Sequence, residues 1–462
     1  MNPFRSAWAW FDERTGLGAT VGGLLEHPVP PTGWDYTIGS AALVAFIVQV
    51  VTGVALAFTY VPSPDQAYAS LEFITHGAVL GGVVRGIHYW GASAMVLLVA
   101  AHMVQVLLIG SFKYPREVNW LSGTLLLVFT FGMAFTGQLL RWNQDAYWAV
   151  VVGAAQAARA PLIGDWLTGI LFAGNSVGGA TLTRFYATHV FMIPAIIFGL
   201  LGLHLYLVIR HGVSEPPVPG VLVDRKTYRQ RYDELLHRIG EPFWPDAGWK
   251  DVVFALAVGT IVLVLAIWLG PPELGAKADP TVLQAYPRPD WYFLWYFALL
   301  ALIPSNVEDV FIIAFPLIIG VLFIALPFIA PTGERSPRRR PWAVGIVSVF
   351  VVAVASLVAV GSAAPWSPPL DEVTLPPTVT QSLTGNAATG AQLFQQRGCI
   401  NCHQIAGRGG QRGPDLTHVG SRLRDYDLTW RILNGGRNMP AYGSTMKPDE
   451  TAALVEFLLA LR

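Results

Sequence analysis

Charged side chains and cysteines are scarce in this sequence. Of its 462 residues only 13% are charged, whereas 53% are hydrophobic. Soluble globular proteins have about 25% charged residues, so this composition excludes an ordinary soluble protein. The only two cysteines lie three residues apart in a single motif, so none remains elsewhere in this chain to ligate an iron–sulfur cluster. The net charge is zero, which by itself says nothing about a nucleic-acid partner, and we expect none.

Long apolar runs are the main feature that is present. A run of about 20 apolar residues is long enough to cross about 30 Å of hydrocarbon. We therefore predict a multi-pass membrane protein. Its seven predicted spans are residues 38–61, 87–109, 118–139, 185–209, 252–270, 308–329 and 343–364.

The distribution of Lys and Arg predicts the orientation of the spans. The N-terminus and the loops at 110–118, 210–251 and 331–342 hold 15 of these residues, and the other side holds six. By the positive-inside rule the first group is cytoplasmic, which places the C-terminus on the outer, periplasmic side of the inner membrane. Met1–Gly18 lacks the features of a cleavable signal peptide and is predicted to form a helix on the cytoplasmic surface.

A change of composition after Pro365 indicates a second domain. The stretch PWSPPLDEVTLPPTVTQSLTG is rich in Pro, Ser and Thr, as linkers are, and the residues after it are polar. The predicted parts are a cytoplasmic surface segment at 1–36, a four-helix part at 37–250, a three-helix part at 251–365, a linker at 366–385 and a water-soluble domain at 386–462.

Four histidines lie inside two of the predicted spans. His88 and His102 are 14 residues apart, and His189 and His204 are 15 apart. At about 100° per residue, each pair shares one helix face with roughly 21–23 Å between its members. Both helices descend from the outer side, so we expect His88 to face His189 there and His102 to face His204 at the inner level. Hydrogen bonding across helices is the alternative, but four histidines at matched depths favour a bis-histidine haem at each level.

Glycines in two other spans repeat this spacing. Gly39 and Gly53 are 14 residues apart, as are Gly123 and Gly137. Such glycines would let their helices approach flat macrocycles at the same two levels, so we predict that all four contact haem. Glycine also serves helix packing in membranes, and only the shared period makes these positions informative.

Both cysteines fall in the motif Cys399-Ile-Asn-Cys402-His403. C-x-x-C-H attaches haem c through two thioethers and uses the histidine as the proximal iron ligand. A redox dithiol would not need His403. Met439, which precedes a proline, is the predicted distal ligand, with Met446 as the second choice. Haem c is attached outside the cytoplasm, in agreement with the predicted topology.

With these sites in place, residues 1–365 resemble cytochrome b of the quinol:cytochrome c oxidoreductases, and most of all the cytochrome bf branch. The resemblance rests on SFKYPREVNWLSG, LTRFYATH, GEPFWP and YPRPDWYF, and on the histidine spacing. Cytochrome bf complexes divide this region between two subunits, whereas here it is continuous and followed by a class I-like cytochrome c. The resemblance implies an all-α fold, in which a seven-helix transmembrane bundle with two bis-histidine b haems precedes a small all-α cytochrome c domain.

The resemblance also implies a function. Quinol oxidised at the outer side would send one electron through a Rieske iron–sulfur partner to haem c. The other electron would cross two non-covalent haem b groups to an inner quinone site, and protons would be released outside and taken up inside. The Rieske protein must be a separate subunit. The other expected partners are membrane lipid, a second copy in a homodimer, and a cytochrome c or terminal oxidase that accepts electrons from the covalent haem c.

Individual residues receive roles from the same resemblance. Asp290 in Pro289-Asp290-Trp291-Tyr292 would accept a proton from quinol, with Tyr292 beside it, although most family members have Glu there. Without the family context, Asp290 could equally be a solvated interfacial residue. Arg85 and Arg184 are predicted to contact the cofactors. Arg210 and Asp35 are the candidates for the inner quinone site.

Several positions depart from the family pattern. The usual GYxLPW is GQLLRW in this chain, with Gln138 and Arg141 in place of Tyr and Pro. Tyr89 stands where the bf pattern tends to have Arg. Thr37 stands where bf proteins have a cysteine that binds an extra haem, so we expect only two b haems and one c haem.

Two other kinds of protein fit parts of the sequence. A bis-histidine cytochrome could anchor a quinone-linked dehydrogenase, and a membrane-tethered cytochrome c could act as an electron carrier or haem sensor. Neither requires the PDWY stretch or the paired glycines. The haem count separates them, because an anchor needs one haem and the Rieske/cytochrome b interpretation needs three.

Overall fold

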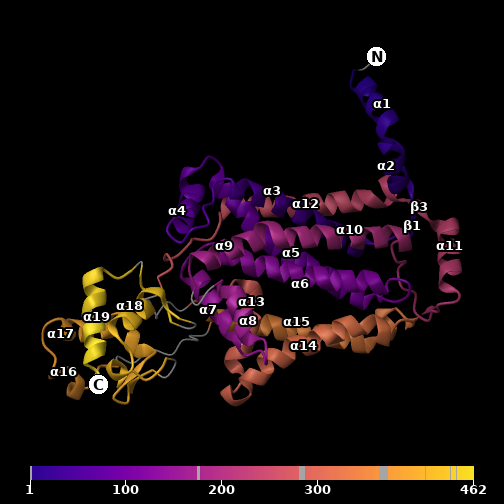
Figure 1. Ribbon diagram of the computed structural model, residues 1–462. Helices are drawn as coiled ribbons and strands as arrows, with labels where there is room; N and C mark the ends of the chain where they lie inside the picture. Colours follow the sequence, from indigo (N-terminus) through magenta and orange to yellow (C-terminus); the bar gives the residue numbers. More distant parts are fainter. Residues whose placement is uncertain are drawn as a thin grey trace.

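The computed structural model of the chain describes residues 3–173, 177–279, 287–363, 373–410, 413–436, 439–443 and 445–462. Long helices lie side by side in a bundle, and a smaller helical domain lies at one end of it (Figure 1). The fold is α-helical, as predicted. Strands among the described residues form three antiparallel pairs, β1 (Pro28–Val29) with β3 (Glu241–Pro242), β2 (Leu222–Val223) with β4 (Gly333–Glu334), and β5 (Gln404–Ile405) with β6 (Arg408–Gly409).

Seven spans among the described residues are long and apolar enough to cross a membrane, which confirms the predicted number. Their helices are α3 (Ile38–Ala57), α5 (Gly81–Leu108), α6 (Glu117–Leu139), α9 (Gly179–Ala187) continuing through η3 (Thr188–Met192) into α10 (Ile193–His211), α12 (Gly248–Trp268), α14 (Ser305–Ile329) and α15 (Pro341–Ala363).

Some span boundaries differ from the prediction for local reasons. The helix α5 begins at Gly81, ahead of the predicted residue 87, because its first turns carry Arg85 and the apolar run starts only after it. The helix α3 ends at Ala57 instead of residue 61. Pro62 follows closely, and a residue that precedes proline disfavours helical backbone.

Four short helices cover the end of the bundle that faces the C-terminal domain (Figure 1). They are α4 (Ala67–Glu72), α7 (Gln144–Ala158), α8 (Gly164–Phe172) and α13 (Trp291–Leu302). None of them was predicted, because each is too short to span the membrane. The helix α13 is wholly apolar or aromatic over 12 residues. Tyr147, Val150 and Leu182 are buried in the hydrophobic cluster that joins α4, α7 and α8 to α6 and α9.

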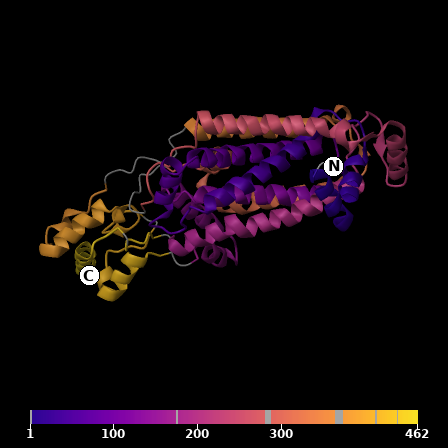
Figure 2. The same cartoon turned by 90° about the horizontal axis from the view of Figure 1, so that it is seen from above.

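The opposite end of the bundle carries α1 (Pro3–Thr15), α2 (Leu17–Glu26) and α11 (Tyr228–Ile239) (Figures 1 and 2). The helix α1 lies across the direction of the spans and leaves Trp8 and Trp10 more than half exposed. Exposed tryptophans on a crosswise helix suit a membrane interface. The N-terminal helices and the C-terminal domain thus lie at opposite ends of the bundle, as an odd number of spans requires.

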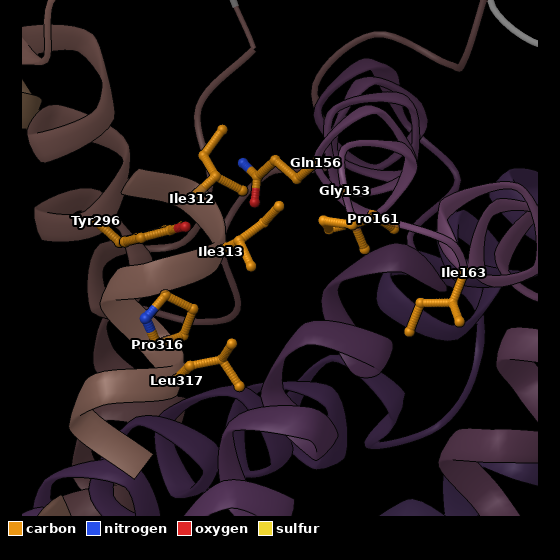
Figure 3. A pocket seen from close by; sticks show the side chains of 11 residues that line it. Gly153, Gln156, Pro161, Ile163, Tyr296, Ile312, Ile313, Pro316 and Leu317 are labelled. Carbon is orange, nitrogen blue, oxygen red and sulfur yellow. The ribbon is translucent and has the colours of Figure 1, made fainter. Parts of the chain in front are cut away.

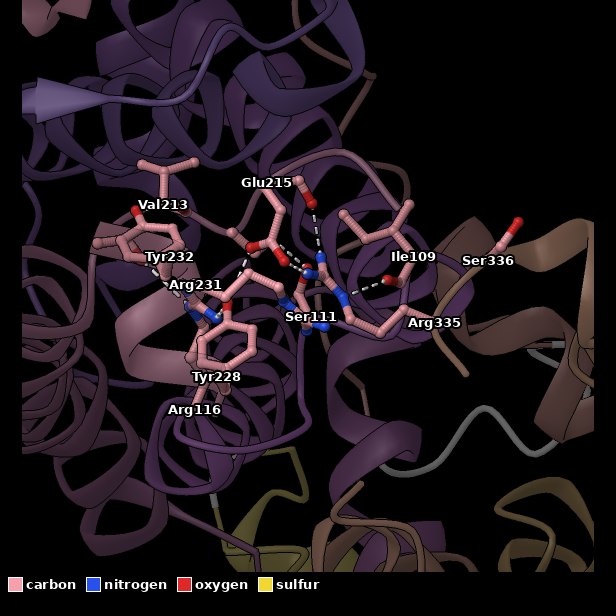
Figure 4. Close-up of polar contacts among 12 residues, drawn as sticks. Ile109, Ser111, Arg116, Val213, Glu215, Tyr228, Arg231, Tyr232, Arg335 and Ser336 are labelled. Carbon is pink, nitrogen blue, oxygen red and sulfur yellow. Dashed lines mark hydrogen bonds and ion pairs between the residues drawn. The ribbon is translucent and has the colours of Figure 1, made fainter. Parts of the chain in front are cut away.

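Buried cations join the two halves of the bundle at the N-terminal end. Arg335 forms a 2.8 Å ion pair with Glu215, and its Nε donates to the carbonyl of Ile109 at 3.3 Å (Figure 4). Tyr228 donates to Glu215 at 2.8 Å and accepts from Arg116 at 2.7 Å. The last carbonyls of a helix lack intrahelical partners and attract cations. The contacts of Arg335 therefore tie the three-helix part to the end of α5.

The C-terminal domain consists of α16 (Pro377–Thr380), α17 (Gly385–Gln396), α18 (Asp425–Asn434) and α19 (Pro448–Ala460). Phe394 and Phe457 meet edge to face in its core. The predicted linker at 366–385 lies partly outside the described residues. Its described remainder packs on this core through Leu375, which is 5% exposed, and Val379. Those residues therefore belong structurally to the C-terminal domain.

The packing of Leu375 predicts a stability effect. Leu375→Ala should lower the free energy of unfolding of the C-terminal domain by about 2–5 kcal/mol, because it opens a cavity in a closed core. Amide hydrogen exchange of α17 and α19 in the full chain measures the change. Thr374→Ala, at an exposed neighbour, is the control. Equal exchange in the two variants would show that residues before α17 do not contribute to the fold.

Candidate functional site

Two histidines meet at the end of the bundle near the C-terminal domain. His88 of α5 and His189 of η3 have ring centroids 6.4 Å apart, with the rings nearly perpendicular. Each Nδ1 is hydrogen-bonded to a threonine on a neighbouring span. The partner of His88 is Thr52 Oγ1 of α3 at 2.9 Å, and the partner of His189 is Thr136 Oγ1 of α6 at 3.0 Å.

These hydroxyl groups determine which imidazole nitrogen carries the proton. Thr52 donates to the carbonyl of Val48 at 2.6 Å, and Thr136 donates to that of Gly132 at 2.8 Å. A hydroxyl has one proton to give, so each threonine must accept from an Nδ1–H group. The lone pair of each Nε2 is therefore left for a metal, which is the arrangement of metal-binding histidines whose other nitrogen is held by a protein oxygen.

The second pair of histidines, His102 and His204, is held in the same way at the other level of the bundle. His204 Nδ1 lies 2.9 Å from Ser122 Oγ, and this hydroxyl donates to the carbonyl of Asn119 at 2.9 Å. His102 Nδ1 lies 3.1 Å from Gln105 Oε1, which can only accept. The two imidazoles are close enough to interact electrostatically. All four histidines thus make their hydrogen bond through Nδ1.

Each of the four predicted glycines faces one of these histidines. A Cβ on Gly137 would lie 2.7 Å from Cε1 of His189, closer than side chains tolerate. The corresponding distances are 3.1 Å for Gly39 and His102, 3.2 Å for Gly53 and His88, and 3.5 Å for Gly123 and His204. The glycines keep the space beside each imidazole open at both levels, so these residues fit a flat macrocycle ligated by two histidines.

The histidine of the C-x-x-C-H motif is oriented in a similar way. His403 Nδ1 donates to the carbonyl of Pro414 at 2.9 Å, which leaves Nε2 for iron. A Cβ on Gly413 would lie 2.6 Å from this ring. Cys399 and Cys402 are half-buried, with Cys399 at the start of η6 (Cys399–Asn401) and Cys402 directly after it. The motif therefore fits a covalently attached haem.

The two candidate methionines occupy different environments. Met446 is only 8% exposed and lies in the core of the C-terminal domain. Met439 is partly buried at the edge of that core, and its backbone pairs with Gly436 in a short bridge. A side chain at the edge can reach a ligand without opening the core, which favours Met439.

A cluster of polar side chains surrounds Asp290 at the start of α13. Its Oδ1 accepts from Arg141 Nη2 at 3.0 Å, and its Oδ2 accepts from the Tyr292 hydroxyl at 2.9 Å. Its backbone N–H donates to Gln138 Oε1 at 3.2 Å. Burial raises the pKa of Tyr292 well above its usual value, so the phenol remains a donor. The structure thus brings Gln138 and Arg141 together with Asp290, although they lie far apart in the sequence.

Two of the three predicted arginines have other described contacts. Arg85 is buried and donates to Thr75 Oγ1 at 2.9 Å and to the carbonyl of Pro272 at 2.8 Å. Arg184 donates to the carbonyl of Ile170 at 2.5 Å, near the end of α8. Arg210, like Asp35, is exposed. The described contacts of Arg85 and Arg184 therefore help to build the end of the bundle near the C-terminal domain and do not involve the histidines.

One carboxylate at the level of His102 was not predicted from the sequence. Asp251 of α12 is hydrogen-bonded to Ser40 of α3, which follows the glycine that faces His102. The neighbouring Lys250 donates to the carbonyl of Thr32 at 2.8 Å. Asp251 stands at the start of a span, where charged residues are common, so only its contact with α3 distinguishes it from an interfacial charge.

A cavity of about 500 Å³ lies between α7, α13 and α14 (Figure 3). Tyr296 and Gln156 approach it from opposite walls, and most of the remaining lining is aliphatic. It contains no His, Cys, Asp or Glu side chain, so it is separate from the clusters described above. Its lining suits a hydrocarbon chain.

Three family models match successive parts of the chain. Residues 26–212 match Cytochrome b/b6/petB, and residues 277–374 match Cytochrome b(C-terminal)/b6/petD. Residues 385–458 match Cytochrome C oxidase, cbb3-type, subunit III. These families imply haem b and haem c as cofactors.

Individual proteins resemble the chain over the same regions. The cytochrome b6 of Heliobacterium modesticaldum is 43% identical over 210 residues, which are 45% of this chain and 99% of that protein. The cytochrome b6 of Mastigocladus laminosus is 38% identical over 212 residues, 46% of this chain and 99% of that protein. A chain of a hyperthermophilic respiratory Complex III superimposes with a TM-score of 0.66 and 29% identity, covering 77% of this chain and 91% of that one.

The contact between Gly137 and His189 predicts a selective loss. Gly137→Val should remove the haem b component next to His189 and leave the other b component, because its side chain would occupy the space beside that imidazole. Redox titration of the b-type absorption band measures both components. Gly132→Val on the same helix is the control, since a Cβ there makes only an ordinary 3.5 Å contact. An unchanged titration in Gly137→Val would contradict the assignment of this glycine.

Proposed function

Because the chain belongs to the cytochrome b/b6 family and ends in a cytochrome c-type domain, we propose that it is the cytochrome b/c subunit of a quinol:cytochrome c oxidoreductase. The observation that carries this proposal is the pairing of four histidines at two depths, each with Nδ1 held by a protein oxygen. The proposed haem b ligands are His88 and His189 at the outer level, and His102 and His204 at the inner level. The proposed haem c ligands are Cys399, Cys402, His403 and Met439.

When bound, these haems supply one-electron transfer between the outer end, the inner end and the electron acceptor. Side chains of the polypeptide accept and donate the protons that accompany these electron transfers. Quinol oxidation releases two protons with two electrons, so the outer site needs a base. Asp290 meets this need, because it lies at the end of the bundle that carries the C-terminal domain and its carboxylate is hydrogen-bonded and only 12% exposed.

The inner site needs the reverse chemistry, because quinone takes up protons when it is reduced. Asp251, beside Ser40 and next to the glycine that faces His102, is the better-placed acid at that level. Arg210, exposed at the end of α10, remains a candidate to bind quinone at this site, but its guanidinium cannot supply the proton. We assign the inner end to the cytoplasm, on the basis of its excess of Lys and Arg.

The proposed complex requires further subunits. A Rieske iron–sulfur protein would accept the first electron from quinol, since this chain has no cysteines beyond the two of the C-x-x-C-H motif. A cytochrome c or terminal oxidase would accept electrons from the C-terminal domain. A homodimer embedded in membrane lipid completes the proposed assembly.

The role of Asp290 predicts a kinetic effect without loss of cofactor. Asp290→Asn should slow quinol oxidation by about 10²–10⁴-fold, because an amide keeps the shape of the side chain but cannot accept the proton. Asp290→Glu should retain activity. Steady-state turnover with a quinol, normalised to haem b content, measures the effect. Asp309→Asn is the control, because Asp309 of α14 is also a carboxylate paired with an arginine, Arg159. Full turnover in Asp290→Asn would exclude Asp290 from the proton path.

The position of Met439 predicts a change of haem c potential. Met439→Ala should lower this potential, because thioether ligation favours ferrous iron. The weak absorption band of the methionine–iron bond in the ferric protein should also disappear. Met446→Ala is the comparison, and it should destabilise the domain core and leave that band in place. Loss of the band in Met446→Ala alone would reverse the assignment.

A further inference from the structure

We propose that Arg141 is a positioning residue for the outer quinol site and that its guanidinium holds the Asp290 carboxylate in the orientation that accepts the proton. The inference rests on the proposed function, because it assigns a second residue to the same site. It starts from the 3.0 Å ion pair between Arg141 Nη2 and Asp290 Oδ1.

The side chain of Asp290 is turned away from its usual local partner. Asp290 is the residue before the first turn of α13, where an aspartate commonly accepts a hydrogen bond from a backbone N–H of that turn. No such bond is present here. Its two oxygens instead accept from Arg141 and from the Tyr292 hydroxyl. The orientation of the carboxylate therefore depends on Arg141 at one oxygen and on Tyr292 at the other, because the backbone of α13 does not fix it.

The chain around Arg141 is itself held in place. Its Nε donates to the carbonyl of Gln138 at 3.2 Å. The next residue, Trp142, is buried and has a left-handed backbone with φ of 49°, a strained conformation for a large side chain. The carbonyl of Trp142 accepts from Ala278 N at 3.2 Å, and Gln144 N donates to the carbonyl of Ala276 at 3.0 Å. A guanidinium on such a segment has a defined position.

The ion pair between Arg141 and Asp290 is largely shielded from water. The side chains of Arg141 and Asp290 are 17% and 12% exposed, so water screens their attraction only in part. Arg85 also lies within electrostatic reach of Arg141, but its guanidinium already donates to Thr75 and to the carbonyl of Pro272. It is therefore not available to replace Arg141 if that cation is removed.

The pair also has a consequence for proton transfer. A carboxylate next to a guanidinium is attracted to it only while the carboxylate is charged. Once Asp290 accepts a proton from quinol, this attraction is lost and the Arg141 charge is left unpaired. Protonation of Asp290 therefore breaks the ion pair that orients its side chain.

Four variants of the assembled complex test the inference. They are Arg141→Gln, Arg141→Lys, Asp290→Asn and the double variant Arg141→Gln/Asp290→Asn. Quinol kcat and KM are measured for each, together with haem b content and potentials as a check on folding. Arg159→Gln is the matched control, because Arg159 also forms an ion pair, with Glu308 at 2.8 Å, but has no described contact with Asp290.

We expect Arg141→Gln to lower kcat by about 10- to 100-fold, the loss that follows from misplacing a catalytic group by about 1 Å. Its KM and haem potentials should stay near those of the native protein. Arg141→Lys should recover most of the rate, since it keeps the charge. The double variant should be no slower than Asp290→Asn, because Arg141 acts through Asp290.

Other outcomes would overturn the inference in distinguishable ways. Native kcat in Arg141→Gln, with Asp290→Asn slow, would remove Arg141 and leave the proposed function intact. A double variant slower than Asp290→Asn by the full Arg141→Gln factor would show that Arg141 acts independently of Asp290. Native kcat in Asp290→Asn would overturn the proposed outer site and, with it, this inference.

Discussion

A buried imidazole needs a partner for each of its two ring nitrogens, and the membrane part of this protein is built around that constraint. The helix containing η3 and α10 and the helix α5 each supply two histidines, whereas α3 and α6 supply three hydroxyls that hold Nδ1 atoms and four glycines that leave room beside the rings. These contacts fix the rotation of four helices about their axes. The same contacts leave every Nε2 in a position to ligate iron.

The sequence predicts this arrangement only in part. Apolar run lengths give the number of spans, and the shared period of about 14 residues gives the two levels, because both follow from helix geometry. The hydroxyl partners are not predictable in this way. Thr52, Thr136 and Ser122 look like ordinary membrane-helix residues until the facing helix is in place. The short helices α7 and α13 escape prediction because their apolar runs are too brief to be distinguished from loops.

The polar cluster around Asp290 shows a further limit of prediction from the sequence. Gln138, Arg141 and Asp290 each depart from the family pattern, and in the sequence they look like separate substitutions. In the structure the carboxylate and the guanidinium are in contact although 149 residues separate them. The three positions are thus one polar unit, in which the cation and the amide accompany the shorter acid. Contacts between the four-helix and three-helix parts depend on tertiary packing, which no local pattern in the chain encodes.

The central claim is that two haem b groups are held by separate histidine pairs. Redox titration of the b-type absorption band in His189→Ala and His204→Ala tests it most directly. The account predicts that each variant loses a different one of two b components, while the covalent haem c of the C-terminal domain is retained in both. Loss of the same component in the two variants, or of both components in a correctly folded variant, would contradict it.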